Sequence, residues 1–314
     1  MNIDKTLIKS FLHATERGAY GASLFKGKND KIAADKAAVD EMRNELNKIN
    51  MNGKIVIGEG ELDEAPMLYV NERLGTKNGD YFDIAVDPLE GTNFTAKNLP
   101  NALSVMAVGK KDSLLCAPDT YMEKIAIGPN LPKNLVDLDY SVEKNINLLA
   151  EVKKVTPSKL SACILNRPRH KSIINSLNSM GVKIRFIEDG DVAGVMTVAI
   201  PRFNTDIYIG TGGGPEGVLA AAALECLGCQ MQTRLSLQNE NEVKKAKKLG
   251  IVDLKKKYNI NEMIKGDVIF CATGVTDGDL VKGIKDCGEF FESESLVLHK
   301  SSNTNKIITN KIKK

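Results

Sequence analysis

The sequence is poor in several residue types, and each shortage excludes a class of protein. It contains no tryptophan and only three histidines, with no HExxH motif or paired histidine spacing that would suit a zinc enzyme. Six cysteines among 314 residues are too few for a disulfide framework, so a reducing cytoplasm is the expected location. The longest apolar stretch runs only from 218 to 224, so neither a signal peptide nor a membrane span is expected.

Charge gives no sign of a macromolecular partner either. The 43 basic and 40 acidic residues leave a formal net charge of +3, which favours neither nucleic acid nor an anionic membrane as a partner. One cysteine pair, Cys226 and Cys229, forms a CxxC that follows an alanine-rich helical stretch and encloses Gly228. A helix ending at this glycine would place the pair where the dipole disfavours thiolate, so we predict structural thiols.

Helix and strand patterns alternate along the chain. Helical patterns cover 4–26, 31–49, 66–74 and 170–180. Strand patterns cover 54–58, 83–87, 102–109, 161–166, 182–187, 206–210 and 266–274. The alternation predicts a layered α/β architecture. A polar helical stretch near 145–159 marks the expected boundary between an N-terminal subdomain, 1–155, and a C-terminal subdomain, 156–314.

The first acidic cluster lies in "IVIGEGELDE", residues 55–64, where four carboxylates follow an apolar run. They are Glu59, Glu61, Asp63 and Glu64. Neighbouring carboxylates raise one another's pKa unless a cation lies between them. The cluster therefore raises the question of which cation these side chains bind.

A second acidic cluster lies in "DIAVDPLEGT", residues 83–92. Asp87, Pro88 and Glu90 resemble a capping box at the start of a helix, but the "GTNFTAKN" that follows is poor in helix formers. The alternative is that Asp87 and Glu90 project from one turn onto the same cation, with Thr92 two residues further on.

An aspartate also lies on the apolar stripe of the helix predicted over 31–49. Asp35 precedes Val39 by four residues and is either a first-turn residue favoured by the helix dipole or a metal ligand. Carboxylate oxygens are preferred by hard ions such as Mg²⁺ and Mn²⁺. Together with Glu59, Asp87 and Glu90, Asp35 supplies enough charge for two such ions.

A glycine-rich turn, "GTGGGPEG", follows the strand predicted over 206–210. Gly212, Gly214 and Gly217 match G-x-G-x-x-G, the dinucleotide-binding pattern. Pro215 inside the turn and the late position in the chain weaken that interpretation. The backbone N–H groups of such a turn can also bind phosphate, and Glu216 would repel the phosphate unless it bound a metal ion.

Two further turns indicate anion recognition or plain solvated loops. Arg167, Arg169 and His170 lie together in "NRPRH" and suit a phosphate group. Asp189 and Asp191 lie in "EDGD" after another strand. The Asp-x-Asp of a haloacid dehalogenase-type phosphatase is a rival interpretation, although that motif usually lies near the N-terminus.

Taken together, these motifs resemble those of a known family. The segments "GEGELDEAPM", "DPLEGTN", "APDTYMEK", "RPRH", "DGDVAG" and "GGGPEGV" occur in the order and spacing of the class II fructose-1,6-bisphosphatases (GlpX type), from about residue 30 to about residue 278. "DPLEGT" is also similar to the metal motif of the wider lithium-sensitive phosphatase superfamily. The resemblance implies an αβαβα sandwich of the sugar-phosphatase type and removal of the 1-phosphate of fructose 1,6-bisphosphate, with sedoheptulose 1,7-bisphosphate as a further substrate of some members.

By position, the resemblance also implies roles for individual residues. Asp35 and Glu59 would bind one Mn²⁺ or Mg²⁺ ion, and Asp87, Glu90 and Glu216 a second. Thr92 would orient the attacking water, and Asp63 matches an acid important for turnover. The positions that match contacts to the sugar bisphosphate are Glu90, Gly91, Thr92, Tyr121, Arg167, Pro168, Arg169, Asp189, Gly190, Asp191 and Gly213. A homodimer or homotetramer is implied as well.

One residue departs from the family pattern. Arg167 stands where some relatives have lysine, which keeps the charge but changes the donor geometry.

Three other functions are weighed against hydrolysis of fructose 1,6-bisphosphate. An inositol phosphatase would share the metal chemistry and differ in substrate. A dinucleotide-dependent oxidoreductase would use the glycine-rich turn, and a non-catalytic metal-binding or sugar-sensing module would not need Thr92.

Overall fold

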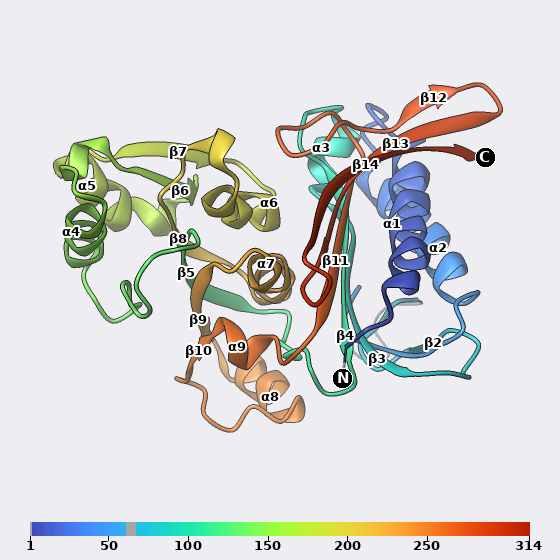
Figure 1. Cartoon of the computed structure of the whole chain (residues 1–314), viewed down its shortest axis with the longest axis horizontal. Coiled ribbons are helices and arrows are strands. Elements are labelled where there is room, and N and C mark those ends of the chain that lie inside the picture. Colours follow the sequence, from blue (N-terminus) through green and yellow to red (C-terminus); the bar gives the residue numbers. More distant parts are fainter. Residues whose placement is uncertain (1, 61–66) are drawn as a thin grey trace. The chain divides into compact units, whose positions relative to one another are not determined.

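The computed structural model describes residues 2–60 and 67–314. The chain folds into two compact units, Met1–Cys116 with Ile264–Lys314, and Ala117–Met263 (Figure 1). Residue 155, the expected boundary, lies inside the second unit. The reason is strand pairing, since β5 (Tyr121–Ile127) pairs with strands of the second unit and β11 (Val268–Gly274) with strands of the first. Among the described residues, no helix has the length and apolar character needed to cross a membrane.

The first unit is built on one mixed sheet. Its strands follow the order β12-β13-β11-β4-β3-β1-β2, and β14 pairs with β13. The bounds are β1 Asn52–Ile57, β2 Arg73–Leu74, β3 Tyr81–Glu90, β4 Leu103–Lys110, β12 Lys285–Cys287, β13 Phe290–His299 and β14 Thr304–Lys313. The helical segments are η1 Lys5–Leu7, α1 Ile8–Ser23, α2 Lys31–Leu46 and α3 Thr92–Ala96.

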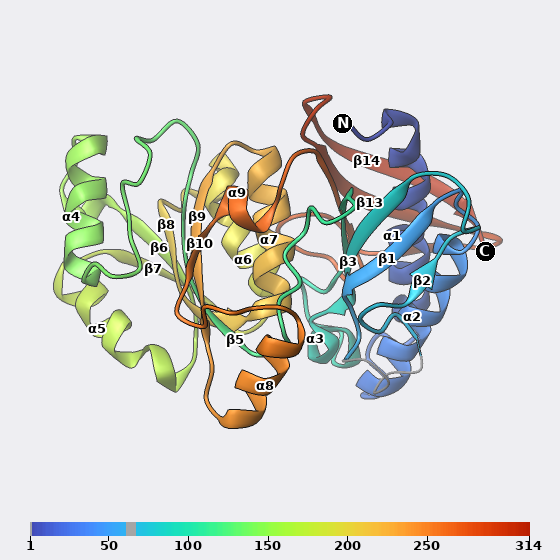
Figure 2. The ribbon, with the colours of Figure 1, turned by 90° about the horizontal axis from the view of Figure 1, so that it is seen from below.

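Helices α1 and α2 lie side by side against this sheet (Figures 1 and 2). The start of α2 is fixed by Asp30, whose side chain accepts a hydrogen bond from the N–H of Ala33 at 2.9 Å. The predicted stripe of Val39, Met42 and Leu46 is buried, as the helical spacing requires. These side chains pack in one core with residues of β1, β3, β4, β11 and β13.

One predicted helix is wrong. Residues 67–74, the described part of the helix expected over 66–74, form turns and the short strand β2, which pairs with β1. Leu68 and Asn71 have φ of 54° and 78°, and left-handed residues interrupt a right-handed helix. The other predicted helices and the predicted strands are confirmed, with bounds that shift by a few residues.

The second unit has its own mixed sheet, in the order β10-β9-β5-β8-β6-β7. Its strands are β6 Ser161–Leu165, β7 Lys183–Ile187, β8 Ile207–Gly213, β9 Gln230–Ser236 and β10 Lys257–Asn259, besides β5. Its α-helices are α4 Val142–Lys153, α5 Lys171–Ser179, α6 Asp191–Met196, α7 Gly214–Cys226, α8 Glu240–Lys248 and α9 Ile260–Met263. Short 3₁₀ turns lie at Pro157–Lys159, Pro168–His170, Thr197–Ala199 and Pro201–Phe203. Both units therefore layer helices on a sheet, which confirms the predicted fold class.

Helices cover both faces of this second sheet (Figure 2). Ile125 of β5 and Ile207 of β8 pack with residues of α4 and α5. Because side chains alternate along a strand, their neighbours Lys124 and Tyr208 point to the opposite face, where α6 and α7 pack. Cys226 ends α7 and Gly228 follows with φ of 67°. Cys229 is buried, and burial raises the pKa of its thiol to about 12, as expected of an unreactive thiol.

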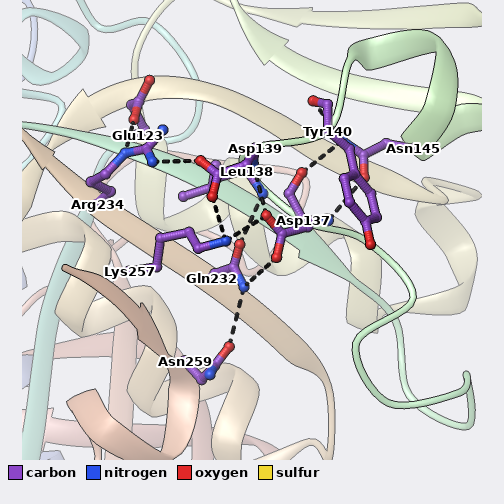
Figure 3. Close-up of polar contacts among 10 residues, drawn as sticks. All are labelled: Glu123, Asp137, Leu138, Asp139, Tyr140, Asn145, Gln232, Arg234, Lys257 and Asn259. Atoms are coloured by element: carbon purple, nitrogen blue, oxygen red, sulfur yellow. Dashed lines mark hydrogen bonds and ion pairs between the residues drawn. The ribbon is translucent and has the colours of Figure 1, made fainter. Parts of the chain in front are cut away.

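A polar network fixes the loop that leads from β5 to α4 (Figure 3). Arg234 of β9 binds Glu123 at 2.7 Å and Asp139 at 2.6 Å. Lys257 of β10 binds Asp137 at 2.7 Å and Asp139 at 2.6 Å. The loop is thereby tied across three neighbouring strands of the sheet.

Candidate active site

The predicted acidic residues of the first unit lie at one edge of its sheet. Strands β1 and β3 are parallel, with Ile57 opposite Ala85. Glu59 and Asp87 each follow these partners by two residues, so they lie near one another at the carboxyl ends of adjacent strands. Asp63, together with Glu61 and Glu64, lies outside the described residues.

An irregularity in β3 brings Asp87 and Glu90 to the same face. Residues three apart on a regular strand point to opposite faces. Here Asp87 lies opposite Val105 and Glu90 opposite Leu103, so three steps on β3 match two steps on β4. This extra residue is a β-bulge, which re-aims a side chain, and both carboxylates therefore lie on the face shared by Val105 and Leu103.

The capping-box interpretation of this segment is wrong. Asp87 and Pro88 belong to the strand β3, and helix α3 begins only at Thr92. Its N-cap is Gly91, in the left-handed conformation with φ of 83°, which glycine adopts without strain. The Asp87 carboxylate accepts a hydrogen bond from the N–H of Leu89 at 3.2 Å, and Gly91 alone separates Glu90 from Thr92.

Asp35 approaches the same part of the first unit through helix α2. Just before α2, the N–H groups of Gly27 and Asn29 bond to the carbonyls of Thr95 and Ala96 in α3, at 3.0 and 2.8 Å. The first turns of α2 therefore lie beside α3. Asp35 is half-buried, and burial raises the pKa of its carboxyl group.

The carboxylates at this edge are neighbours but do not converge. Within residues 2–60 and 67–314, no three His, Cys, Asp or Glu side chains form a group that could hold a metal ion. Four acids gathered at one edge, with Asp35 and Glu90 partly or wholly removed from water, fit the oxygen-rich chemistry of a hard divalent ion.

In the second unit, the predicted substrate residues also lie at one edge of the sheet. Strands β6, β7 and β8 are parallel, so the segments after them meet at the same edge. The segments after β6 and β7 carry Arg167–Arg169 and Asp189–Asp191, and Gly213 is the last residue of β8. Tyr121 belongs to the same edge because it lies directly opposite Gly213 in the antiparallel pairing of β5 with β8.

The two arginines at this edge are held by the backbone. The Arg169 guanidinium donates two hydrogen bonds to the carbonyl of Thr211, at 3.0 and 2.7 Å, and lies 4.7 Å from the centre of the Tyr121 ring. Arg167 donates to the carbonyls of Asn166 and Glu188. Arg169 is exposed and Arg167 half-buried, so both present donors to an anion at the surface.

His170, whose sequence context left its role open, is structural. The buried ring lies 2.7 Å from the Leu165 carbonyl through Nδ1, and its Nε2 accepts the N–H of Thr211 at 2.8 Å. Nδ1 therefore carries the proton, and the imidazole is neutral. Burial lowers the pKa of His170. The ring ties the turn after β6 to β8 rather than contacting a ligand.

Asp191 is the centre of a buried charged cluster. Its two carboxylate oxygens accept hydrogen bonds from the Lys124 ammonium and the Tyr208 hydroxyl, and both donors are wholly buried. Asp191 opens α6 after Gly190, which has φ of 78°. This carboxylate is therefore bonded to buried protein groups on both oxygens, whereas Asp189 nearby is half-buried.

Glu216 in the first turn of α7 has an unsatisfied carboxylate oxygen. Its Oε2 atom is enclosed and, among the described residues, has no hydrogen-bond partner. Burial raises the pKa of Glu216, and the charge of Lys124 opposes that shift. A buried carboxylate oxygen without a donor is costly in a folded protein, and binding a metal ion would remove that cost.

The glycine-rich turn makes room for these carboxylates. A Cβ atom on Gly212 would lie 2.1 Å from Asp191 Oδ2, and one on Gly213 would lie 1.9 Å from Glu216 Oε2. The strand that follows α7, β9, pairs with β5 and not with β8. The geometry therefore differs from a dinucleotide-binding βαβ unit, and the glycines serve close packing of side chains.

Lys124 and Tyr208 were not predicted as members of the site. In "YMEKIAI", Lys124 shares a strand face with Met122 and Ala126. A lysine between two apolar residues on one strand face is the sequence signal that identifies a buried cation. Tyr208 offers no comparable signal, because tyrosine is common in buried strands.

Comparisons with known proteins place these motifs in one family. The sequence model described as "Bacterial fructose-1,6-bisphosphatase, glpX-encoded" matches residues 5–312. The chain is 41% identical to the Haemophilus influenzae protein named "Fructose-1,6-bisphosphatase class 2", over 96% of this chain and 94% of that relative. It is also 41% identical to "Fructose-1,6-bisphosphatase 1 class 2" of Escherichia coli K12, over 96% of this chain and 93% of the relative.

Proposed function

The chain belongs to the GlpX-type family of bacterial class 2 fructose-1,6-bisphosphatases, and on this premise we propose that it hydrolyses fructose 1,6-bisphosphate to fructose 6-phosphate and phosphate. This is a reaction of gluconeogenesis. The proposal is carried by the extent of the similarity: the family model matches residues 5–312, a range that spans both units and contains the candidate site.

Two divalent ions, Mn²⁺ or Mg²⁺, are the proposed cofactors. Asp35 and Glu59 would hold one ion, and Asp87, Glu90 and Glu216 the other. The enclosed Oε2 of Glu216 and the bulge that turns Asp87 and Glu90 to one face support this assignment. When bound, such ions neutralise charge on phosphoryl oxygens and lower the pKa of a water molecule.

The remaining proposed residues bind and orient the reactants. The Thr92 hydroxyl, in the turn after Glu90, would orient the attacking water, and Asp63 would accept a proton. The Arg167 and Arg169 guanidiniums would bind the phosphate that is not transferred, which distinguishes a bisphosphate from a monophosphate. Tyr121, Pro168, Asp189 and Gly213 would contact the sugar phosphate. Asp191 would act from its buried position, holding the turn that contains Asp189 and Gly190.

Two broader properties are proposed from the same family membership. We propose that the protein acts in the cytoplasm as a homodimer or homotetramer. Light scattering coupled to size exclusion measures the mass of the assembly directly. A mass equal to the 34.2 kDa of one chain would contradict the oligomer.

The first test is phosphate release from fructose 1,6-bisphosphate with and without Mn²⁺. Wild type should release phosphate only with metal, whereas Glu59→Ala and Thr92→Ala should lose activity while their far-UV spectra remain unchanged. A parallel panel contains sedoheptulose 1,7-bisphosphate and inositol monophosphate. Cleavage of inositol monophosphate without cleavage of the bisphosphates would contradict the proposed substrate and keep the metal chemistry.

A further inference from the structure

The second unit has a cavity at the edge of its sheet opposite the candidate site. Its volume is about 620 Å³, and its walls include Lys153, Lys159, Ser161, Lys183 and Asp206. Ser161 and Lys183 are the first residues of β6 and β7, and they pair with each other. Asp206 directly precedes β8 and its N–H bonds to the Ser161 carbonyl at 2.8 Å. The cavity therefore lies at the amino ends of three adjacent parallel strands.

This edge is separated from the candidate site by the length of the strands. The predicted substrate residues of the second unit lie at or just after the carboxyl ends of β6, β7 and β8, or opposite that end in β5. The strand β7 has five residues, which corresponds to roughly 16 Å along the sheet at 3.3 Å per residue. A ligand in the cavity would therefore not contact Arg167, Arg169 or Asp189.

The charges at the cavity are mainly positive. Lys153 forms an ion pair with Asp206, whose other oxygen accepts the N–H of Ser161 at 2.8 Å. Among residues 2–60 and 67–314, the ammonium groups of Lys159 and Lys183 have no hydrogen-bond or ion-pair partner. Asp206 thus offsets the charge of Lys153, and the charges of Lys159 and Lys183 remain uncompensated. A concave wall focuses the electrostatic field of such charges.

Two arginines lie close to one wall of the cavity. Phe203 lines the cavity, and the guanidinium carbons of Arg185 and Arg202 each lie 5.1 Å from the centre of its ring. Both distances are typical of cation–π contacts. The ring is thus partly covered by guanidinium groups, which limits its use as a surface on which a base would stack.

We propose that this cavity binds a small phosphorylated anion, separate from the substrate of the candidate site. Lysine ammonium groups bind phosphate as point charges, and the volume lies within the range of small-molecule sites, which is about 300–1,000 Å³. A sugar monophosphate and a nucleoside diphosphate share this chemistry. Their difference in size and charge allows the experiment to separate them. The inference does not depend on the proposed hydrolytic activity.

Isothermal titration calorimetry on the full chain in EDTA tests the proposal. The probes are inorganic pyrophosphate, ADP and glucose 6-phosphate. The Arg169→Ala background weakens the proposed phosphate contacts of the catalytic edge, so that this edge contributes less to the measured binding. In that background, Lys159→Glu/Lys183→Glu reverses the uncompensated charge. Lys247→Glu/Lys248→Glu, on two exposed lysines of α8, is the control with the same change in net charge.

At least one probe should bind Arg169→Ala with one site per chain. The Lys159→Glu/Lys183→Glu substitutions should raise its Kd by at least about tenfold, as expected for loss of two direct charge contacts, and the control by less than about twofold. Binding that disappears in Arg169→Ala alone, or an equal effect of both double variants, would overturn the proposal. If the charge reversal prevents folding, Lys159→Gln/Lys183→Gln provides the same comparison without added acids.

The hydrolysis assay separates this result from the proposed function. The Lys159→Glu/Lys183→Glu enzyme should retain kcat and KM for fructose 1,6-bisphosphate in the absence of added anions. Absence of hydrolysis in wild type would remove the proposed function while leaving the calorimetric result intact. Absence of calorimetric binding in an active enzyme would remove only the cavity site.

Discussion

The two units carry their candidate residues at similar places in their sheets but with different chemistry. At the edge of the first sheet, carboxylates come from three segments: Asp35 from α2, Glu59 from just after the end of β1, and Asp87 and Glu90 from β3. At the edge of the second, Asp191 and Glu216 lie with Lys124, and Arg167 and Arg169 lie in the turn after β6. The first edge suits cations, and the second combines acids with cations of the protein itself and suits a sugar phosphate.

The largest effect is expected from removing the internal cation of the second edge. Lys124→Met leaves the buried Asp191 without its ammonium partner beside Glu216, and breaking a buried ion pair costs about 3–5 kcal/mol. Urea denaturation should show this loss in the free energy of unfolding. If the free energy changes by less than about 1 kcal/mol, the value expected of a surface pair, then the cluster does not stabilise the unit.

A double variant sharpens this comparison. Lys124→Met/Asp191→Asn removes both charges, so it should be more stable than Lys124→Met alone, because the isolated buried carboxylate is gone. A double variant that is less stable by the sum of the two single losses would indicate that the residues act independently.

A smaller loss is expected when a side chain is added to the glycine-rich turn. Gly212→Ala would place a Cβ atom against Asp191, whose two oxygens are already bonded. Overpacking of this kind costs about 1–3 kcal/mol, which thermal unfolding should detect as a lower Tm. Gly228→Ala is the control, because no atom lies within 4 Å of the added carbon and only the φ of 67° is unfavourable there. Equal losses in both would contradict the packing explanation.

The arginines of the second edge should affect substrate binding more than turnover. Arg169→Ala removes an exposed guanidinium whose charged hydrogen bonds to phosphate are worth about 1.5–3 kcal/mol, so KM should rise about 10- to 100-fold while kcat changes little. Arg169→Lys should give an intermediate KM, since lysine keeps the charge without the planar fork. Equal losses of kcat with an unchanged KM would exclude this role.

The smallest effect is expected at the surface network of the second unit. Burial raises the pKa of Asp137, but hydrogen bonds from Lys257, the Asp139 N–H and Gln232 lower it by more than burial raises it. The net pKa of Asp137 is therefore below its ordinary value. The stability from this group is therefore complete above the ordinary Asp pKa of about 3.9 and is lost as the pH falls below it. Lys257→Met should cost no more than about 1 kcal/mol at pH 7.

Lys257→Met should also weaken the loss of stability that the wild type shows at acid pH. Urea midpoints measured from pH 7 down to pH 3 provide both the stability loss at pH 7 and its dependence on pH. A Lys257→Met loss as large as that of Lys124→Met would contradict the distinction between the surface network and the buried cluster.

The sequence predicts the acidic edge better than the buried cluster. Asp87 and Glu90 follow a strand pattern, and the segment "GTNFTAKN" after them is poor in helix formers, which already argues against a helix cap. The bulge that turns both to one face depends on pairing with β4, which local sequence does not reveal. The helix expected over 66–74 fails because left-handed Leu68 and Asn71 are set by tertiary context. The hydrogen bonds to Asp191 come from β5 and β8, far from it in sequence.

Direct measurement of Mn²⁺ binding tests the central claim that the acids of the first edge hold catalytic metal. Electron paramagnetic resonance of free Mn²⁺ during titration reports the number of bound ions without requiring turnover. Wild type should bind two ions per chain, and Asp87→Asn/Glu90→Gln should lose one of them while remaining folded. Binding of two ions with unchanged affinity in that variant would contradict the assignment of Asp87 and Glu90 as metal ligands.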